Sequence, residues 1–588
     1  MRLLRFQPFY VALAVAAIFV PEAIAEGFRW QTLDENAFRR ARVENKPVYV
    51  LVDSFLSELG LATVKSLEGP DTAAFFNSHF ICVRVDRDAR PDFAAAAQDY
   101  LSRVKQLPGW PANVWLTPEG KPFDGANYLP AVEEWGKKSL SETAKRNADA
   151  WGHDPAGCRR AGNDAMAMLR PPLAAAAGYD PSRLPGVFAA AAQVWRAAGA
   201  PHGGFGEPPI YAQPELLRFL LLRGGADRAL ALTTLRWLGT SALRDPLDGG
   251  FFTYLRDGEG HLPYPQKTLL DQARLALVFL DAQSYEPEPL FATCARGALD
   301  YVLVRLKLAG GTFAAAEDGT GEGREDSFAW TAAEVRQALG PQSALFEAAF
   351  AVAPSGNISP DSDPSGQFAG KNLLRRVGTI GEPQSERLLA ESCARLLAIR
   401  DRRPAPRRDL RPAAVSHGWL LAAFARAGKD LGDARYVAAA RALGRTVSET
   451  FVSVDATVRP FSGNEPSTAG PADYAALALG FETLAQAQAD DHAQALATRL
   501  LTTCDARFLD PTRNEYDASE AQLAAGVFAR SPADVLTEHQ PSPDAVALLA
   551  GPPPEAARRL ASGLVLRSQD QALMPGDALL ALSVKSSR

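Results

Sequence analysis

The sequence predicts a protein of two unlike parts, a small α/β layer domain followed by a large all-helical domain. In residues 26–150, short apolar runs alternate with helical segments, which is typical of a sheet covered by helices. Most of the remaining chain is rich in Ala and Leu at helical spacing. At 588 residues, the chain is long enough for more than one hydrophobic core.

The composition is that of a globular protein with no strong electrostatic bias. Apolar residues make up 47% of the chain and charged residues 22%, and the formal net charge is -6. No dense block of Lys and Arg follows the N-terminus. This balance argues against nucleic acid or an anionic membrane surface as the main partner.

Residues 1–25 have the pattern of a targeting segment. Arg2 and Arg5 precede an unbroken apolar run from Phe9 to Val20, and Ala23-Ile24-Ala25 supplies a small-x-small cleavage pattern. We therefore expect an exported protein, periplasmic or secreted, with an uncleaved N-terminal anchor as the alternative. The run is too short to span a bilayer comfortably, and no span is expected in the mature chain.

The first domain is expected over residues 26–150. Asp34 is a plausible N-cap for a helix ending near Glu44. Three buried strands are predicted, in the β-rich apolar runs Pro47–Val52, Phe80–Val85 and Asn113–Leu116.

The five cysteines do not form a recognisable site. They are scattered, odd in number and never spaced as Cys-x-x-Cys: Cys82, Cys158, Cys294, Cys393 and Cys504. Such spacing resembles neither a disulfide framework nor a zinc site. Buried free thiols are expected, and neither a metal nor another cofactor is predicted.

The second domain is expected over residues 171–540, after a turn-rich linker at 151–170, and residues 541–588 read as a tail packed on it. Glycine pairs recur at Gly203-Gly204, Gly249-Gly250 and Gly310-Gly311, each before a polar, aromatic loop. Glycine pairs allow sharp turns at the ends of helix hairpins. About twelve predicted helices would make six hairpins closed into a ring.

Several longer motifs stand in an order that resembles one known family. In the first domain they are Lys46-Pro47-Val48-Tyr49, Val85 to Asp92, Pro108-Gly109-Trp110-Pro111 and Trp115 to Pro122. In the second they include His202 to Gly206, Leu247 to Phe251 and Gly370-Lys371-Asn372-Leu373. The chain resembles the spermatogenesis-associated protein 20 family, which joins a thioredoxin-like domain to an (α/α)₆ barrel similar to N-acylglucosamine 2-epimerases and six-hairpin glycosidases.

The resemblance places the family's redox motif on residues that cannot exchange thiols. Its Cys-x-x-Cys falls on Leu56-Ser57-Glu58-Leu59, and its cis-proline turn falls on Trp110-Pro111. Thiol exchange needs a thiolate and a resolving thiol, so thiol–disulfide oxidoreductase activity is excluded. Leu56 and Leu59 either pack inward and brace the second domain or form a groove for a peptide or partner.

The barrel mouth is the expected ligand site, because carboxylates, histidines and aromatic rings there suit sugars. The candidates for acid–base chemistry are His417, Glu317 and Asp318. The candidates for ligand binding are Tyr254, Lys267, Asp271, Trp330 and Trp419.

Each candidate also has a structural interpretation. Lys267 and Asp271 could be an i,i+4 ion pair, Trp330 and Trp419 core residues, and His417 a structural histidine. Glu317 and Asp318 could belong to a solvated loop.

The chain also departs from the family in this second domain. Phe252 replaces a histidine, Pro263 to Lys267 lacks a histidine and a glutamate, and Ser416-His417-Gly418 replaces Trp-Asn-Gly. Losing these proton-transfer groups favours a binding protein for a carbohydrate or similar polar ligand. A sugar isomerase, epimerase or glycosidase and a protein-interaction scaffold using the thioredoxin-like groove are the alternatives.

Overall fold

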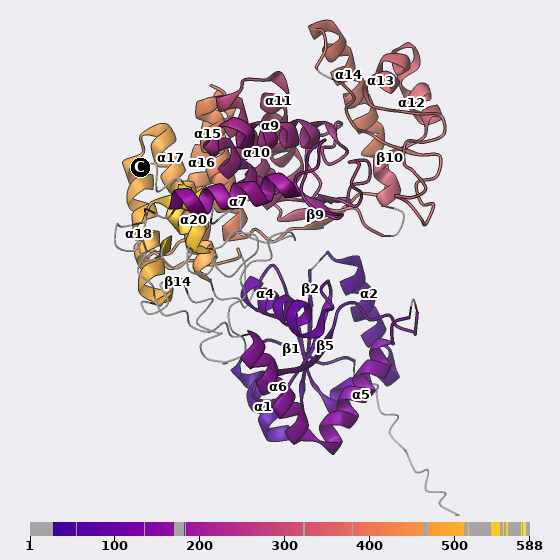
Figure 1. The fold of residues 1–588 in the computed structure, drawn as a ribbon, viewed down its shortest axis with the longest axis vertical. Helices are drawn as coiled ribbons and strands as arrows, with labels where there is room; N and C mark the ends of the chain where they lie inside the picture. Colours follow the sequence, from indigo (N-terminus) through magenta and orange to yellow (C-terminus); the bar gives the residue numbers. More distant parts are fainter. Residues whose placement is uncertain are drawn as a thin grey trace, which may run out of the picture.

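The computed structural model describes most of the chain, in the ranges 27–54, 56–134, 136–169, 184–321, 324–378, 380–462, 469–510, 515–516 and 543–552. Residues 182, 557, 560–561, 578 and 580–583 are also described. The predicted targeting segment and most of the predicted tail lie outside these residues. The thioredoxin-like domain lies against one side of the helical domain (Figure 1).

The first domain is a five-stranded mixed sheet in the order β1-β3-β2-β4-β5. Its strands are β1 (Trp30–Gln31), β2 (Val48–Asp53), β3 (Ile81–Asp86), β4 (Ala112–Leu116) and β5 (Pro122–Ala126). β1, β3 and β2 are parallel, and β4 pairs antiparallel with both β2 and β5. Every residue of β2 and β4 is buried, as the continuous apolar runs predict for central strands.

Helices cover both faces of this sheet. They are α1 (Glu35–Glu44), α2 (Glu58–Leu67), α3 (Pro70–His79), α4 (Pro91–Asp99), α5 (Leu140–His153) and α6 (Pro155–Leu169), with a π-helical turn at Tyr100–Lys105. Asp34 caps α1 by accepting a hydrogen bond from the Ala37 amide, as predicted. The Trp110–Pro111 peptide bond is cis, as the resemblance implied.

The predicted linker at 151–170 is wrong for its ordered part. Residues 155–169 form α6, which packs on β5. Ala165, Met166 and Leu169 are buried in the same core as β2, β3 and β4. The turn-like residues that suggested a linker instead form a helix that completes the first domain.

The second domain consists of helices in two layers. The inner helices pack side by side in the order α8 (Pro214–Arg223), α10 (Leu269–Tyr285), α15 (Ala414–Asp430), α17 (Pro471–Gln488) and α20 (Pro543–Ala550). The outer helices α9 (Gly225–Thr240), α11 (Pro289–Tyr301), α16 (Ala434–Phe451) and α18 (Asp491–Phe508) each pack on the inner helix before them. α7 (Leu184–Ala198) packs on α9. The predicted fold class is confirmed.

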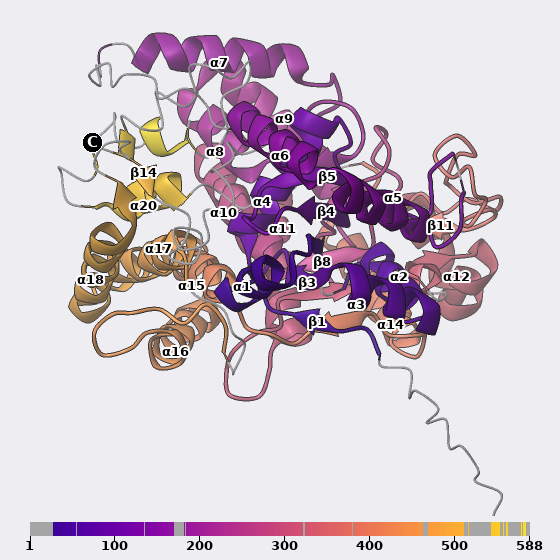
Figure 2. The ribbon, with the colours of Figure 1, turned by 90° about the horizontal axis from the view of Figure 1, so that it is seen from below.

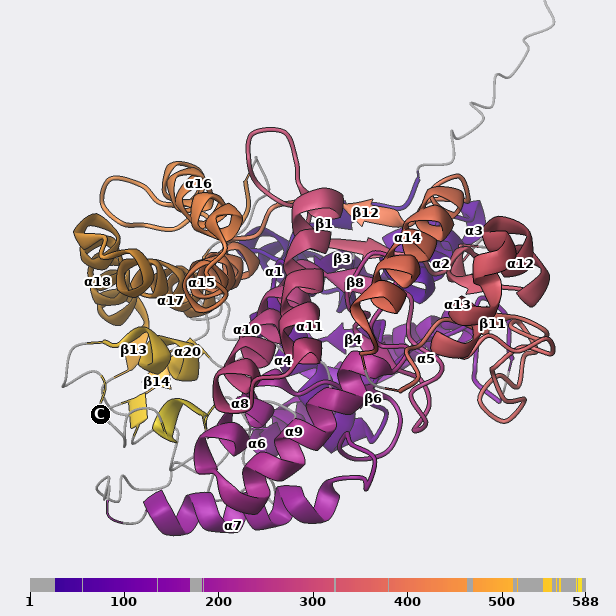
Figure 3. The same cartoon turned by 90° about the horizontal axis from the view of Figure 1, so that it is seen from above.

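One group of helices lies outside these layers. α12 (Ala332–Leu339), α13 (Ser343–Ala349) and α14 (Pro383–Arg400) pack on one another and have their own hydrophobic core. They lie on the side of the molecule opposite α15–α18 (Figure 3). The segment at 384–400, which has the pattern of a ring helix, therefore belongs to an insertion between α11 and α15.

Short strands lead into the inner helices on the side that faces the first domain. They are β6 (Ile210–Tyr211) before α8, β8 (Gln266–Thr268) before α10 and β12 (Arg407–Asp409) before α15. β6 pairs with β7 (Tyr254–Leu255), and β9 (Ala316–Asp318) lies between β8 and β12. We call this side of the helical domain the mouth. The view from below shows the thioredoxin-like domain in front of it (Figure 2).

The other short strands lie away from the mouth sheet. β10 (Ala329–Trp330) pairs with β11 (Asn372–Leu373), and β13 (Leu509–Asp510) pairs with β14 (Glu515–Tyr516). α20 falls in the segment predicted as a peripheral tail, but it packs on α17 and its residues lie in the main core. The helical domain therefore extends beyond the predicted boundary at residue 540.

Candidate functional site at the mouth

The strands β8, β9 and β12 form a three-stranded antiparallel sheet that carries most of the charged residues of the mouth. Lys267, Glu317 and Arg408 are paired across the three strands, and so are Gln266, Asp318 and Arg407. Because directly paired residues share a face and successive residues alternate, the sheet presents two polar rows. The row with Lys267 contacts charged residues of the helical domain, and the row with Arg407 contacts the thioredoxin-like domain.

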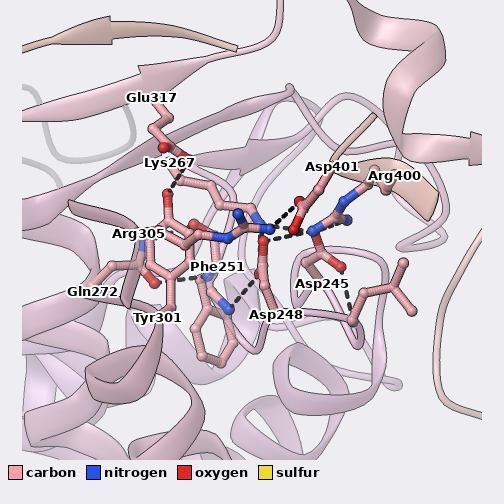
Figure 4. A network of polar contacts seen from close by, with 12 residues as sticks. Asp245, Asp248, Phe251, Lys267, Gln272, Tyr301, Arg305, Glu317, Arg400 and Asp401 are labelled. Carbon is pink, nitrogen blue, oxygen red and sulfur yellow. Dashed lines mark hydrogen bonds and ion pairs between the residues drawn. The ribbon is translucent and has the colours of Figure 1, made fainter. Parts of the chain in front are cut away.

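Lys267 lies at the centre of a buried ion network (Figure 4). Its Nζ is 2.8 Å from Asp245 and 2.7 Å from Asp248. Arg400, at the end of α14, contacts the same two carboxylates at 2.6 and 2.7 Å. All four side chains are at most 8% exposed.

The charges in this network balance. Burial alone would raise the pKa of Asp245, but Arg400 and Lys267 outweigh that effect and hold it below its usual range. The Lys267 ammonium also lies 4.7 Å from the ring centre of Phe252 and 4.9 Å from that of Tyr301, where cation–π attraction adds to the ion pairs. The predicted Lys267–Asp271 pair is replaced by these contacts with the 245–248 loop.

Glu317 lies beside this network and keeps contact with solvent. Its side chain is 17% exposed. The Tyr301 hydroxyl donates a hydrogen bond to Glu317 Oε2 at 2.9 Å, and Arg408 Nε lies 3.4 Å from Oε1. Burial raises the pKa of Glu317 above its ordinary value, against the opposing effects of the Tyr301 hydrogen bond and the Lys267 charge. A carboxyl in this state is a candidate hydrogen-bond or proton donor.

Asp318, the neighbouring candidate, is fully buried. It accepts hydrogen bonds from Gln266 Nε2 at 2.9 Å and from the Thr320 amide at 2.7 Å. Arg407 Nη2 lies 3.7 Å away. These contacts give Asp318 the geometry of a residue that fixes the loop after β9.

His417 lies in α15 and is fully buried. Its Nε2 accepts a hydrogen bond from the Phe313 amide at 3.0 Å, so Nδ1 carries the proton and donates to the Ala413 carbonyl at 2.8 Å. Burial lowers the pKa of His417 to about 4. With both ring nitrogens engaged by the backbone, this imidazole has no nitrogen directed at a ligand.

The structure places the remaining candidates in different surroundings. Trp419 is buried in the main core and Trp330 in the core of the α12–α14 insertion, where Arg403 lies 3.9 Å from its ring centre. Asp271 accepts a hydrogen bond from Thr268 Oγ1 in the first turn of α10. Tyr254 is half-buried at the mouth.

Tyr254 belongs to a column of aromatic rings on the α8 side of the mouth. It stacks on Tyr264 with ring centres 4.7 Å apart and contacts Tyr211 at 5.0 Å. Arg256 lies 5.2 Å from the ring centre of Tyr264 and pairs with Glu325. Tyr264 is three residues before Lys267, so its Cα lies within roughly 11 Å of the Lys267 Cα.

The sequence reasoning missed five residues that shape this site: Asp245, Asp248, Tyr301, Arg400 and Arg408. Asp248 lies within the Leu247 to Phe251 motif and Asp245 lies two residues before it, and Arg400 and Arg408 belong to the segment 400–411, in which Arg recurs. These were the available signals. Tyr301 lies at the end of a regular amphipathic helix, where nothing in the pattern marks it.

The enclosed space beside the site is small. A cavity of about 20 Å³, room for about one water molecule, lies next to the ion network and is lined by Asp245, Phe252, Phe328 and Arg400 together with six other residues. This is below the range of about 300–1,000 Å³ that is usual for ligand pockets. A ligand that reaches Glu317 would therefore lie in the mouth rather than in this cavity.

The described residues contain neither a disulfide nor a cluster arranged to bind a metal ion. None of the five cysteines, all within the described ranges, forms a disulfide, four of them are buried, and burial raises the pKa of Cys82. Leu56 is buried and Leu59 is 43% exposed. No group of three His, Cys, Asp or Glu side chains in the described ranges is arranged to hold a metal ion. No described helix is both long and apolar enough to cross a membrane.

Comparisons with known proteins agree with the motifs. The family model Thioredox_DsbH, described as "Protein of unknown function, DUF255", matches residues 14–170. Human spermatogenesis-associated protein 20 is 27% identical over 555 residues, covering 85% of this chain and 70% of that protein. The mouse protein is also 27% identical, over 557 residues, with the same coverage.

The chain also has a distant likeness to solved structures. The GH76 α-mannanase of Bacteroides thetaiotaomicron aligns with 69% of this chain and 98% of its own, with a TM-score of 0.39 and 9% identity. The resemblance to the spermatogenesis-associated protein 20 family that the motifs indicated is confirmed by the sequence comparisons.

Proposed function

For this relative of spermatogenesis-associated protein 20, we propose a role in binding a polar ligand of the carbohydrate class at the mouth of the helical domain, without redox chemistry. The observation that carries the proposal is the state of Glu317. It is 17% exposed, its carboxyl is held by Tyr301, and its pKa is raised by burial. A protonated carboxyl can donate a hydrogen bond to a ligand hydroxyl, and an ionised one can accept.

The surroundings of Glu317 suit a polyhydroxylated ligand. Arg408, whose side chain is 34% exposed, adds hydrogen-bond donors beside the carboxyl. The tyrosine column at Tyr211, Tyr254 and Tyr264 adds phenol groups on half-buried rings on the α8 side of the mouth. Hydroxyl, carboxyl and guanidinium groups beside aromatic surface are the combination that binding sites for sugars use.

Binding is favoured over turnover by the same geometry. Glycoside hydrolysis needs a second carboxylate that is free to act as a base or nucleophile. The two carboxylates of the ion network, Asp245 and Asp248, are buried and neutralised by Lys267 and Arg400. Glu317 therefore has no second carboxylate in this network that is free of a cation.

The proposal is tested by thermal shift of residues 26–588 against a panel of mono- and oligosaccharides. Ligand at about 100 times its Kd adds about 2.7 kcal/mol of stability, which is a measurable shift. The shift should be lost in Glu317→Gln and kept in Glu286→Gln, a surface carboxylate whose side chain is 52% exposed. A flat response of the wild-type chain across the panel would contradict the proposal.

A further inference from the structure

Leu56 and Leu59 stand at the two positions of the lost redox motif, and the first of them is the less exposed. In thiol exchange the attacking sulfur at the first position must reach its substrate. Here Leu56, at that first position, is 4% exposed, whereas Leu59 is 43% exposed. The first position is therefore buried, and one contact at Leu56 comes from the helical domain.

The mouth of the helical domain contacts the backbone at Leu56. Arg407 of β12 donates from Nη2 to the Leu56 carbonyl at 2.7 Å and to Thr320 Oγ1 at 3.1 Å. Leu56 and Arg407 are 351 residues apart in the chain. This one guanidinium therefore joins the start of α2 to the loop that follows β9.

The loop after β9 also approaches α2 directly. At Gly321 a Cβ atom would lie 2.8 Å from Glu58 Oε1, a separation closer than van der Waals contact. Glu58 is the first residue of α2. Gly321, whose φ of +70° suits glycine, therefore places the loop beside the Glu58 side chain at the start of α2.

A second ion pair joins the domains at the same edge of the sheet. Arg411 Nη1 lies 2.8 Å from Asp86 Oδ2, and the two side chains are 17% and 19% exposed. Asp86 ends β3, and Leu56 follows the end of the parallel strand β2. The two residues that the helical domain contacts, Leu56 and Asp86, thus lie where β2 and β3 end, on the side that carries the former redox motif.

We propose that the exchange face of the thioredoxin-like domain is the docking face for the helical domain of its own chain, with Arg407 and Arg411 as its anchors. The thioredoxin-like domain is then held against Arg407, Arg411 and the loop after β9, and position 56 is closed to other proteins. The loss of cysteine and the closure of the face are separate changes, so restoring a thiol at position 56 would not restore exchange with a protein disulfide.

Introduced thiols in the full chain test this docking. Leu56→Cys and Leu59→Cys are compared for their rates of reaction with an aromatic disulfide reagent, after subtraction of the five native thiols measured in the wild-type chain. We expect the thiol at position 56 to react on the order of 100-fold more slowly than the thiol at position 59. Equal rates would overturn the proposal.

A second comparison separates docking from burial within the thioredoxin-like domain itself. Adding Arg407→Ala and Arg411→Ala to Leu56→Cys should raise its reaction rate towards that of Leu59→Cys, whereas Arg402→Ala, at an exposed position of the same stretch, should not. Protection that survives loss of both anchors would show that the helical domain is not the cover.

Hydrogen exchange gives the same test without an introduced thiol. Amides in the first turn of α2 should exchange faster in Arg407→Ala than in Arg402→Ala when both chains keep wild-type circular dichroism. Equal exchange in the two variants would count against docking at α2. Neither readout depends on a ligand, so the docking can fail or hold independently of the proposed sugar site.

Discussion

Arg400 and Asp245 are 155 residues apart in sequence, and their side chains meet at 2.6 Å in the interior of the helical domain. Arg400 ends α14 of the insertion, and Asp245 lies in the loop after α9. The pair therefore connects the α12–α14 insertion to the helix layers. Asp245 also contacts Lys267, which is paired with Glu317 across β8 and β9 (Figure 4).

Removing the arginine from this network should be costly. Arg400→Met leaves Asp245 and Asp248 with Lys267 alone, and breaking a buried pair costs about 3–5 kcal/mol. Urea denaturation measures the loss. Arg402→Met, at an exposed position two residues along, should change stability by less than about 0.5 kcal/mol. A similar small effect for Arg400→Met would show that the network is not intact in solution.

The inner helices contain a second buried ion pair, Glu215 of α8 with Arg274 of α10. Arg274 Nε lies 2.8 Å from Glu215 Oε1, and the side chains are 9% and 5% exposed. Arg274→Met alone should cost about 3–5 kcal/mol, because it leaves the carboxylate buried without its partner. The double variant with Glu215→Gln should recover part of that loss, as judged by the urea midpoint. A double variant no more stable than Arg274→Met would indicate that the buried charge is not the cause.

The first domain could be predicted from the sequence in most of its parts. Its central strands are apolar runs without interruption, and a strand buried on both faces leaves this pattern. The predicted strand at Phe80–Val85 differs from β3 by one residue at each end. α6 was missed because its Gly, Asp and Asn residues resemble a turn, while its burial depends on the distant strand β5.

The candidate site was harder to predict because its pairs lie between loops that are distant in sequence. Lys267 and Asp271 have the spacing of an ion pair on a helix, but α10 begins only at Leu269. Lys267 is therefore in a strand, and its partners are Asp245 and Asp248. His417 stands between Ser416 and Gly418, a polar context in sequence, yet α15 is an inner helix buried on nearly all sides.

The raised pKa of Glu317 predicts how this residue changes stability with pH. Since burial places its folded pKa above the unfolded value, the carboxyl favours folding at acidic pH, and this contribution is lost as the pH rises through the folded pKa. Glu317→Gln should therefore be more stable than wild type at about pH 8, with a difference that shrinks towards about pH 4. Chemical denaturation at several pH values measures this. A Glu317→Gln chain that is less stable at the higher pH would contradict the assigned environment.

His417 predicts a dependence with the opposite sign. Its folded pKa of about 4 is below the unfolded value of 6.5, so its contribution is complete above the unfolded pKa and is lost as the pH falls towards the folded one. The full difference corresponds to about 3 kcal/mol. Between about pH 7 and pH 4.5, wild type should lose more stability than His417→Gln, whereas His153→Gln, at an exposed position, should follow wild type. Parallel pH profiles for all three chains would show that His417 is not held neutral by the Phe313 amide and the Ala413 carbonyl.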